Sequence, residues 1–265
     1  MKPNFEMRIG VITAAVIVLM SFTSFFWTPY DYNSMNHENR LLRPGVKNLL
    51  GTDNFGRDIF SRIMAGGRNS LIVAVCTVIA AASVGGILGL LAGYLGGITD
   101  AVIMRIIDTV NSFPGIILAL FMVAVLDNGP FTLFTALLIL FIPSYTRIMR
   151  TGAMQYKNAA FIQAERIIGA NFWRITVVHI LPNLSVPLLS ASVLGLSNAI
   201  LAEASMSYLG MGIQPPQPSW GRMLYESQAY FFTSPWCALA PGFLITFTVV
   251  AFHLLGVGLR RRFGE

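Results

Sequence analysis

The sequence predicts an all-α integral membrane protein with about six transmembrane helices, and its composition and apolar runs support this class. Of the 265 residues, 55% are hydrophobic and only 11% are charged, and the mean hydropathy is +0.66. A soluble domain carries roughly 25% charged residues, whereas lipid disfavours charge because each buried ion is costly. Several apolar runs approach the ~20 helical residues that cross a bilayer core. The composition of the chain is therefore that of a protein embedded in lipid rather than one dissolved in water.

The first apolar run, residues 9–27, follows Lys2 and Arg8, an arrangement that cleaved signal peptides share with membrane anchors. No small-residue cleavage motif follows the run, which closes with the aromatic segment FFWTPY. Aromatic side chains gather at the membrane–water interface. We therefore expect a retained anchor helix, and we divide the chain into an N-terminal anchor with an external segment, residues 1–69, and a five-helix transmembrane domain, residues 70–265.

Five further apolar runs predict the remaining membrane spans. They cover residues 70–95, 115–127, 131–149, 178–208 and 237–259. The run 115–127 is short, and we expect residues before Pro114 to lengthen it. The run 178–208 contains Pro182 and Pro187, which predict a tilt or a kink.

Glycines in the second span occur at a spacing of four residues, as in Gly85, Gly89 and Gly93. Small residues at this spacing allow helices to approach closely in lipid. They predict packing within this chain, and the alternative is a contact with a second membrane subunit.

The segment DAVIMRIIDTVNSFP, residues 100–114, has the pattern of an amphipathic helix. Val102, Ile106 and Val110 fall on one helical face, and Asp108 falls elsewhere. This pattern predicts a helix lying at the cytoplasmic boundary of the membrane.

The basic residues predict the orientation of the chain. An even number of spans places both termini on one side, and that side collects 11 of the 18 basic residues: Lys2, Arg8, Arg105, Arg147, Arg150, Lys157, Arg166, Arg174 and Arg260 to Arg262. The positive-inside rule makes this side cytoplasmic. Residues 28–69 argue the other way, because the external segment carries six basic residues. Both termini are nevertheless predicted to be cytoplasmic.

The cytoplasmic loop of residues 150–177 is longer than a simple connection requires. Residues 159–168 are rich in helix formers, Gly169 interrupts them, and Asn171 can cap a further turn. A short helix, a glycine turn and a second helix leading into the membrane would form a knob that fits a groove on another protein.

This loop resembles the membrane subunits of bacterial binding-protein-dependent ABC importers. Their cytoplasmic E-A-A-x-x-x-G segment, followed later by I-x-L-P, is similar to Gln163-Ala164-Glu165-Arg166-Ile167-Ile168-Gly169 and then His179-Ile180-Leu181-Pro182. Gln163 stands where the family usually has Glu, and Glu165 where it has the second Ala. The stretches LLGTDNFGRDIFSRIMAGGRNSL, DAVIMRIIDTVNSFPG and SYLGMGIQPPQPSWGRML extend the resemblance, to the C-type subunit of dipeptide, oligopeptide and nickel importers, over nearly the full chain.

The resemblance implies a type I importer permease fold in a bacterial inner membrane. It implies four kinds of partner besides the lipid bilayer: a second homologous permease, two ABC ATPase subunits, an extracytoplasmic substrate-binding protein, and a cargo of peptides or of nickel and metal chelates. ATP and Mg would be bound by the ATPases, since no lysine of this chain stands in a P-loop motif, and we expect no cofactor here. The residues implied to couple to the ATPase are Ala160, Gln163, Ala164, Glu165, Gly169 and Ala170.

Two acidic residues near apolar runs are candidates for the translocation path, because intramembrane carboxylates are functional candidates by default. Asp108 has the alternative of lying at the watery interface, and Glu203 that of reaching outward from its span. His179 and His253 have no neighbouring ligands in sequence, so no metal site is predicted. Cys76 and Cys237 have no evident bridging partner, so no disulfide is expected.

Two rival classes of function were weighed against an importer subunit. An intramembrane hydrolase needs a nucleophile motif, and the chain contains no G-x-S-x-G and no H-E-x-x-H. A stand-alone secondary transporter or channel predicts paired half-repeats with broken helices and no long cytoplasmic loop. The net charge of +6 does not indicate nucleic-acid binding, because the basic residues lie at the ends of apolar runs. No catalytic residue is therefore predicted.

Overall fold

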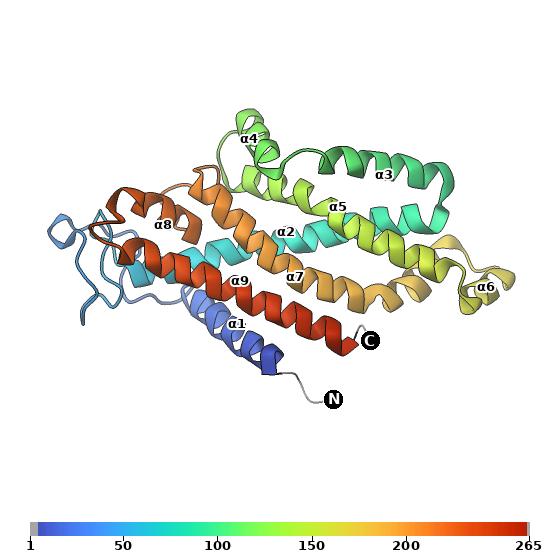
Figure 1. Cartoon of the computed structure of the whole chain (residues 1–265), viewed down its shortest axis with the longest axis horizontal. Coiled ribbons are helices and arrows are strands. Elements are labelled where there is room, and N and C mark those ends of the chain that lie inside the picture. Colours follow the sequence, from blue (N-terminus) through green and yellow to red (C-terminus); the bar gives the residue numbers. More distant parts are fainter. Residues whose placement is uncertain (1–4, 264–265) are drawn as a thin grey trace.

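The computed structural model describes residues 5–263 and shows an elongated bundle of helices (Figure 1). Lys2, counted above among the cytoplasmic charges, lies outside these residues. The long helices are α1 (Phe5–Thr23), α2 (Ile59–Leu95), α5 (Pro130–Lys157), α7 (Leu181–Tyr208) and α9 (Trp236–Phe263). The shorter elements are η1 (His37–Asn39), α3 (Gly97–Asn111), α4 (Gly115–Leu126), α6 (Ala160–Ile167), η2 (Arg174–Ile180), α8 (Trp220–Ser227) and η3 (Gln228–Tyr230).

The predicted all-α membrane class is confirmed. Within the described residues, five helices are long and apolar enough to cross a membrane, and a sixth span results if the bent pair of α3 and α4 counts as one. Helix α2 packs along α5, and α1 packs against α9. The first residues of α1 and the last residues of α9 lie at the ends of these helices that point away from α8 (Figure 1).

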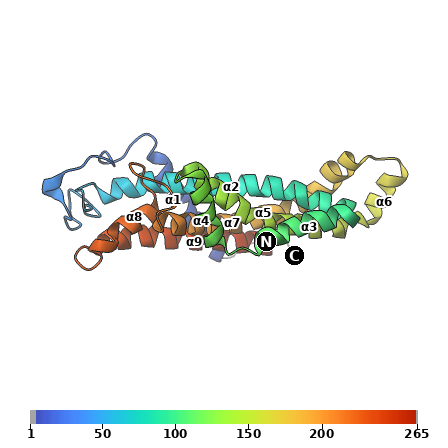
Figure 2. The same cartoon turned by 90° about the horizontal axis from the view of Figure 1, so that it is seen from above.

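Two structures outside the spans lie at opposite ends of the bundle. Helix α6 forms one tip, and α8 with the segment of residues 28–58 forms the other, in both views (Figures 1 and 2). The predicted cytoplasmic knob and the predicted external segment are thus separated by the length of the long helices.

The region around Pro114 differs from the prediction. We expected residues before Pro114 to lengthen the third span, but α3 and α4 meet at an angle of 89°. Proline lacks an N–H and restricts the residue before it to extended conformations, so the helix stops there. Helix α4 is therefore left with 12 residues, shorter than a full crossing needs.

A π-helical segment joins the knob to α7. Element η2 is a π-helix that runs directly into α7 at Leu181, one residue before Pro182. A π-helix widens the turn and often marks a functional site. Helix α7 continues through Pro187 to Tyr208, and the tilt or kink expected from the two prolines stays a prediction.

The glycine stripe of α2 packs within the chain, as the first of the two alternatives predicted. A Cβ atom at Gly85, Gly89 or Gly93 would collide with a backbone carbonyl oxygen of α5. Without side chains at these positions, the α2 and α5 backbones touch directly, which is how helices associate in lipid. The α2–α5 pair is consequently a tight contact running the length of the subunit.

We expect Gly89→Ala to destabilise the chain and Gly86→Ala to be tolerated. A Cβ at position 89 would lie 2.7 Å from Met149 Cβ and 2.9 Å from Arg150 N, whereas at position 86 the nearest atom is 3.9 Å away. Overpacking of this kind costs roughly 1–3 kcal/mol. Thermal unfolding of the two purified variants in detergent measures the difference, and equal stability would contradict direct contact between the backbones.

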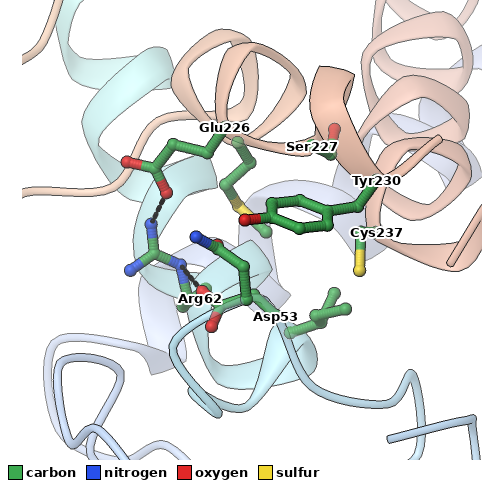
Figure 3. A pocket seen from close by; sticks show the side chains of 9 residues that line it. Asp53, Arg62, Glu226, Ser227, Tyr230 and Cys237 are labelled. Carbon is green, nitrogen blue, oxygen red and sulfur yellow. Dashed lines mark hydrogen bonds and ion pairs between the residues drawn. The ribbon is translucent and has the colours of Figure 1, made fainter. Parts of the chain in front are cut away.

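Buried ion pairs attach the external segment to α8 and to the start of α2 (Figure 3). Arg62 is 2% exposed; its Nη2 lies 3.0 Å from Glu226 Oε2, and its Nε lies 3.5 Å from Asp53 Oδ2. Arg57 Nη2 lies 2.8 Å from the same oxygen of Glu226, and its Nε 2.6 Å from Asp53 Oδ2. Two of the basic residues that opposed the predicted orientation are therefore paired with carboxylates and do not present free charge.

Candidate functional site

The knob begins where α5 leaves the apolar part of the bundle. The prediction ended the fourth span at residue 149, but α5 continues as one helix to Lys157. After two further residues α6 starts, and it projects beyond the other helices at the tip of the molecule (Figures 1 and 2). The knob is thus a direct extension of a spanning helix.

Helix α6 is anchored by one fully buried side chain. Ile162 is 0% exposed and belongs to a cluster of buried apolar residues that also includes Met149, Ile175 and Ile180. These residues come from α5 and from η2. The short helix is therefore packed against the elements that enter and leave the knob.

The six residues implied to couple to an ATPase separate into two groups by exposure. Ala160, Gln163, Ala164 and Gly169 are exposed, whereas Glu165 and Ala170 are half-buried. The exposed residues are small or polar, so the face of α6 that they form is free to meet another molecule. The half-buried pair faces the inside of the knob.

Gly169 ends α6 in the way the sequence predicted. Its φ is +83°, a left-handed conformation that glycine adopts without strain. Gly169 N donates to Arg166 O at 3.0 Å, and Ala170 N donates to Glu165 O at 2.9 Å. These two bonds make a Schellman motif, which satisfies the last carbonyl groups of a helix and fixes the direction of the chain that leaves it.

The second arm of the knob is capped and tied to the first by polar contacts. Asn171 Oδ1 accepts a hydrogen bond from Arg174 N at 2.8 Å, which confirms the predicted cap. Glu165 Oε2 lies 3.5 Å from His179 Nε2 and 3.7 Å from Arg174 Nε. Glu165, which stands where the resembling family has alanine, thus joins α6 to η2.

Tyr94 contacts the knob, and the sequence interpretation missed it. It lies at the end of α2, and its hydroxyl accepts a hydrogen bond from Arg166 Nε at 3.3 Å. Its ring lies 5.3 Å from that of Phe172 in an edge-on arrangement and 5.1 Å from the Arg166 guanidinium. The only sequence signal was an aromatic residue at the end of an apolar run. Through Tyr94 the knob contacts α2 as well as α5 and α7.

The tip of the knob exposes apolar side chains. Ile167 is 86% exposed, and Ile168 and Trp173 are also largely exposed. Beside them lies a groove of about 200 Å³, lined by Glu165, Ile168, Gly169, Ala170, Asn171 and Arg174. Exposed apolar residues with a polar rim, outside the apolar part of a bundle, are typical of a protein-interaction site.

Asp108 lies on α3 and is exposed, with an ion pair to Arg147 of α5 at 2.8 Å. The neighbouring Asp100 accepts a hydrogen bond from Arg150 Nη2 at 2.6 Å. These two pairs tie α3 alongside α5. The structure does not separate the interfacial role of Asp108 from a role in translocation, so both stay predictions.

Glu203 is enclosed by α2, α7 and the start of α8. Its side chain is 0% exposed, and Ser207 Oγ donates a hydrogen bond to its Oε1 at 2.7 Å. The hydroxyls of Ser70 and Ser219 lie against the same carboxylate. Glu203 therefore does not reach outward to solvent in this structure, and its place in the pathway stays a prediction.

The metal-ligating residue types are scattered through the described part of the chain. Residues 5–263 contain no group of three or more His, Cys, Asp or Glu side chains arranged to hold a metal ion. His179 contacts Glu165 in the knob, and Cys76 and Cys237 are both free thiols. The knob is the site in which the predicted residues gather.

The fold and the site define a polytopic helical membrane protein whose packed knob exposes a surface of the kind that binds another protein. Residues 85–264 match the family described as the inner membrane component of binding-protein-dependent transport systems, and the chain belongs to this family. It is a multi-pass inner membrane protein of the permease class. The match begins in α2 and includes the whole knob.

Named relatives resemble the chain over nearly its full length. It is 38% identical over 260 residues to the dipeptide transport system permease protein DppC of Alkalihalophilus pseudofirmus, covering 98% of this chain and 86% of the relative. It is 39% identical over 254 residues to the glutathione transport system permease protein GsiD of Pectobacterium atrosepticum, covering 94% and 84%. The probable D,D-dipeptide permease DdpC of Escherichia coli is 35% identical over 253 residues, covering 94% and 85%.

Proposed function

We propose that this chain is the permease subunit of an ATP-driven importer and forms the membrane pathway together with a second, homologous permease. The observation that carries the proposal is the knob, which is exposed at its tip and packed at its base against α5 and η2. An element that transmits the movement of a partner protein to the membrane helices needs both properties. Its exposed tip must contact the partner, and its packed base must keep its position relative to the helices.

The proposed partners at the knob are two ABC ATPase subunits, one for each permease. Ala160, Gln163, Ala164 and Gly169 would contact the ATPase, while Glu165 and Ala170 would keep the two arms of the knob together. ATPase closure would then move α5, α7 and α2 as one body through Ile162 and Tyr94. Packed helices usually transmit a local displacement by shifting together between two discrete arrangements.

We propose that ATP and Mg are bound by these partners and that this chain is not catalytic. Its lysines, Lys2, Lys47 and Lys157, do not form the phosphate-binding motif that nucleotide hydrolysis requires. The chain would contribute the pathway and the knob, and the ATPases the chemical energy.

The proposed substrates are short peptides delivered by an extracytoplasmic binding protein. Relatives that share most of this chain are named for dipeptides and for glutathione, which is itself a tripeptide. Nickel chelates, the alternative raised by the sequence, are named in none of these three. Asp108 and Glu203 are proposed contributors to the pathway, either directly or by holding helices that line it.

We propose that both termini and the knob face the cytoplasm of a bacterial cell. Five basic residues lie on or beside the knob end of the bundle: Arg147, Arg150, Lys157, Arg166 and Arg174. The positive-inside rule places such an end in the cytoplasm. Residues 1–69 would then supply an anchor helix and an external segment, and residues 70–265 the transporting domain.

We expect Ile167→Glu to weaken ATPase association strongly without affecting folding. Ile167 is 86% exposed, so the carboxylate costs little in the free subunit, but it would be buried unpaired at the ATPase contact. Loss of a central interface anchor costs about 2 kcal/mol or more, which is at least roughly thirtyfold in affinity. Co-purification of the ATPases with the tagged permease measures this loss.

Phe232→Glu is the matched control for this experiment. Phe232 is 96% exposed and lies near α8, at the opposite end of the bundle from α6. The same loss of apolar surface and gain of charge there should leave ATPase association unchanged. If both variants retain the ATPases, the knob is not the docking element and the proposed function fails.

A further inference from the structure

A groove on the outside of the bundle, between α1, α2 and α9, has no role in the function proposed above. It is an open groove with about 640 Å³ of empty space, part of which is open to the surroundings. Its walls are almost entirely apolar and include Phe22, Phe25, Leu71, Ile72, Val75 and Phe252. An apolar surface on the outside of a membrane-spanning bundle contacts either lipid or another membrane subunit.

One cation stands at the end of this groove. Arg68 lines it, with its guanidinium 4.9 Å from the centre of the Phe25 ring and 6.0 Å from that of Tyr32. Its Nε contacts Asn69 Oδ1 at 3.5 Å, and within residues 5–263 it has no carboxylate at salt-bridge distance. A charge at the edge of a bilayer, without an acidic partner in the protein, is free to bind an anion.

The position of Arg68 matches the depth of lipid headgroups. Phe25 belongs to the aromatic segment that closes the first span, and such segments lie at the membrane–water interface. From Arg68 the groove follows α2 to Cys76, a distance of ~12 Å at 1.5 Å per residue. The cation is thus at the interface, and the apolar walls extend from it into the hydrocarbon.

An extended hydrocarbon chain is much thinner than a helix, which is ~10 Å across with its side chains. The groove runs ~12 Å along α2, and its apolar lining offers such a chain a surface to pack against.

We propose that the groove binds one anionic phospholipid, with an acyl chain between α1 and α2 and the headgroup phosphate at Arg68. The apolar walls alone would not select among lipids, because every acyl chain is equally apolar. Selection comes from the charge, since a zwitterionic headgroup carries its own cation and competes with Arg68 for the phosphate. A bound lipid would fill the space that separates the anchor helix α1 from α2.

The test measures lipids that stay bound to the intact transporter, with its partner subunits, in native mass spectrometry. The complex is extracted from nanodiscs that contain equal amounts of phosphatidylglycerol and phosphatidylcholine. The wild type should retain phosphatidylglycerol in preference, and Arg68→Gln should reduce this preference roughly fivefold, the effect of one basic residue at a lipid surface. Arg68→Lys keeps the charge and should keep the preference.

A second pair of variants tests the acyl chain separately from the headgroup. Ile72→Trp places an indole in the groove and should remove the bound lipid. Ile79→Trp is the matched control, because Ile79 lies two turns further along α2, is exposed, and does not line the groove. Neither variant touches the knob, so ATPase association should persist in both.

Four results would overturn the proposal. The first is equal retention of the two lipids by the wild type, and the second is unchanged retention in Ile72→Trp. The third is a near-complete crosslink from Cys76 to the partner permease in a Cys237→Ser background, which would show protein covering the groove. Displacement of the bound lipid by free glycerol phosphate would likewise show a site for the phosphate alone.

Discussion

Replacing Gly169 with valine is expected to remove most uptake by the assembled transporter while the chain still inserts into the membrane. The φ of +83° is strained for any side chain and most of all for a β-branched one. Such strain costs about 1–3 kcal/mol, which shifts the turn away from its present geometry by a factor of roughly 5–150. Since α6 and η2 meet at this turn, uptake and ATPase co-purification should fall together by a similar factor.

Gly210→Val is the matched control for Gly169→Val. Gly210 has a φ of +81°, and at both glycines an added Cβ would meet no atom within 4 Å. The two variants therefore carry the same backbone strain and no clash of the added Cβ, Gly169 in the knob before η2 and Gly210 just after α7. Gly210→Val should keep its ATPase subunits. If Gly169→Val transports peptide at the wild-type rate, the turn has no coupling role.

The features that the sequence predicted well depend on neighbouring residues. The helix over residues 159–168, the glycine turn and the Asn171 cap all rest on interactions within one or two turns, so propensity and capping rules apply directly. The apolar runs were recognised because a bilayer imposes a length on them. The spans and the outline of the knob were therefore visible without coordinates.

The features that the sequence did not predict depend on contacts between distant segments. Glu165 meets His179 across the knob, and Tyr94 reaches the knob from the end of α2. The periodicity of apolar residues in the sequence does not predict these two contacts. The span was predicted to begin at residue 70, but helix α2 begins at Ile59. The sequence did not predict the earlier start, because Arg62 looks unsuitable for a buried helix until its partners Asp53 and Glu226 are known.

The third span was not predicted correctly from the sequence. Residues before Pro114 were expected to lengthen it, but α3 and α4 meet at 89°. Two ion pairs between distant segments, Asp100 with Arg150 and Asp108 with Arg147, lie between α3 and α5, and hydropathy carries no information about such contacts.

The same kind of long-range pairing predicts a large loss of stability for Glu226→Gln. Glu226 Oε2 accepts hydrogen bonds from Arg57 Nη2 at 2.8 Å and from Arg62 Nη2 at 3.0 Å, and both arginines are buried. Glutamine keeps the shape of the side chain but removes the charge, which leaves two buried cations with Asp53 as their remaining carboxylate. Breaking a buried pair in this way costs about 3–5 kcal/mol.

A loss of that size is a large part of the ~5–15 kcal/mol that stabilises a typical protein, so Glu226→Gln should accumulate poorly in membranes and unfold at lower temperature in detergent. Glu6→Gln makes the identical chemical change in an exposed pair, with Arg261 Nη1 2.9 Å from Glu6 Oε2, where the expected cost is only about 0–1 kcal/mol. Equal stability of the two variants would mean that water already screens Arg57 and Arg62, because Glu226 is the more buried carboxylate and has more arginine partners. A clear difference would instead make the Glu226 contacts the main attachment of the external segment to α8.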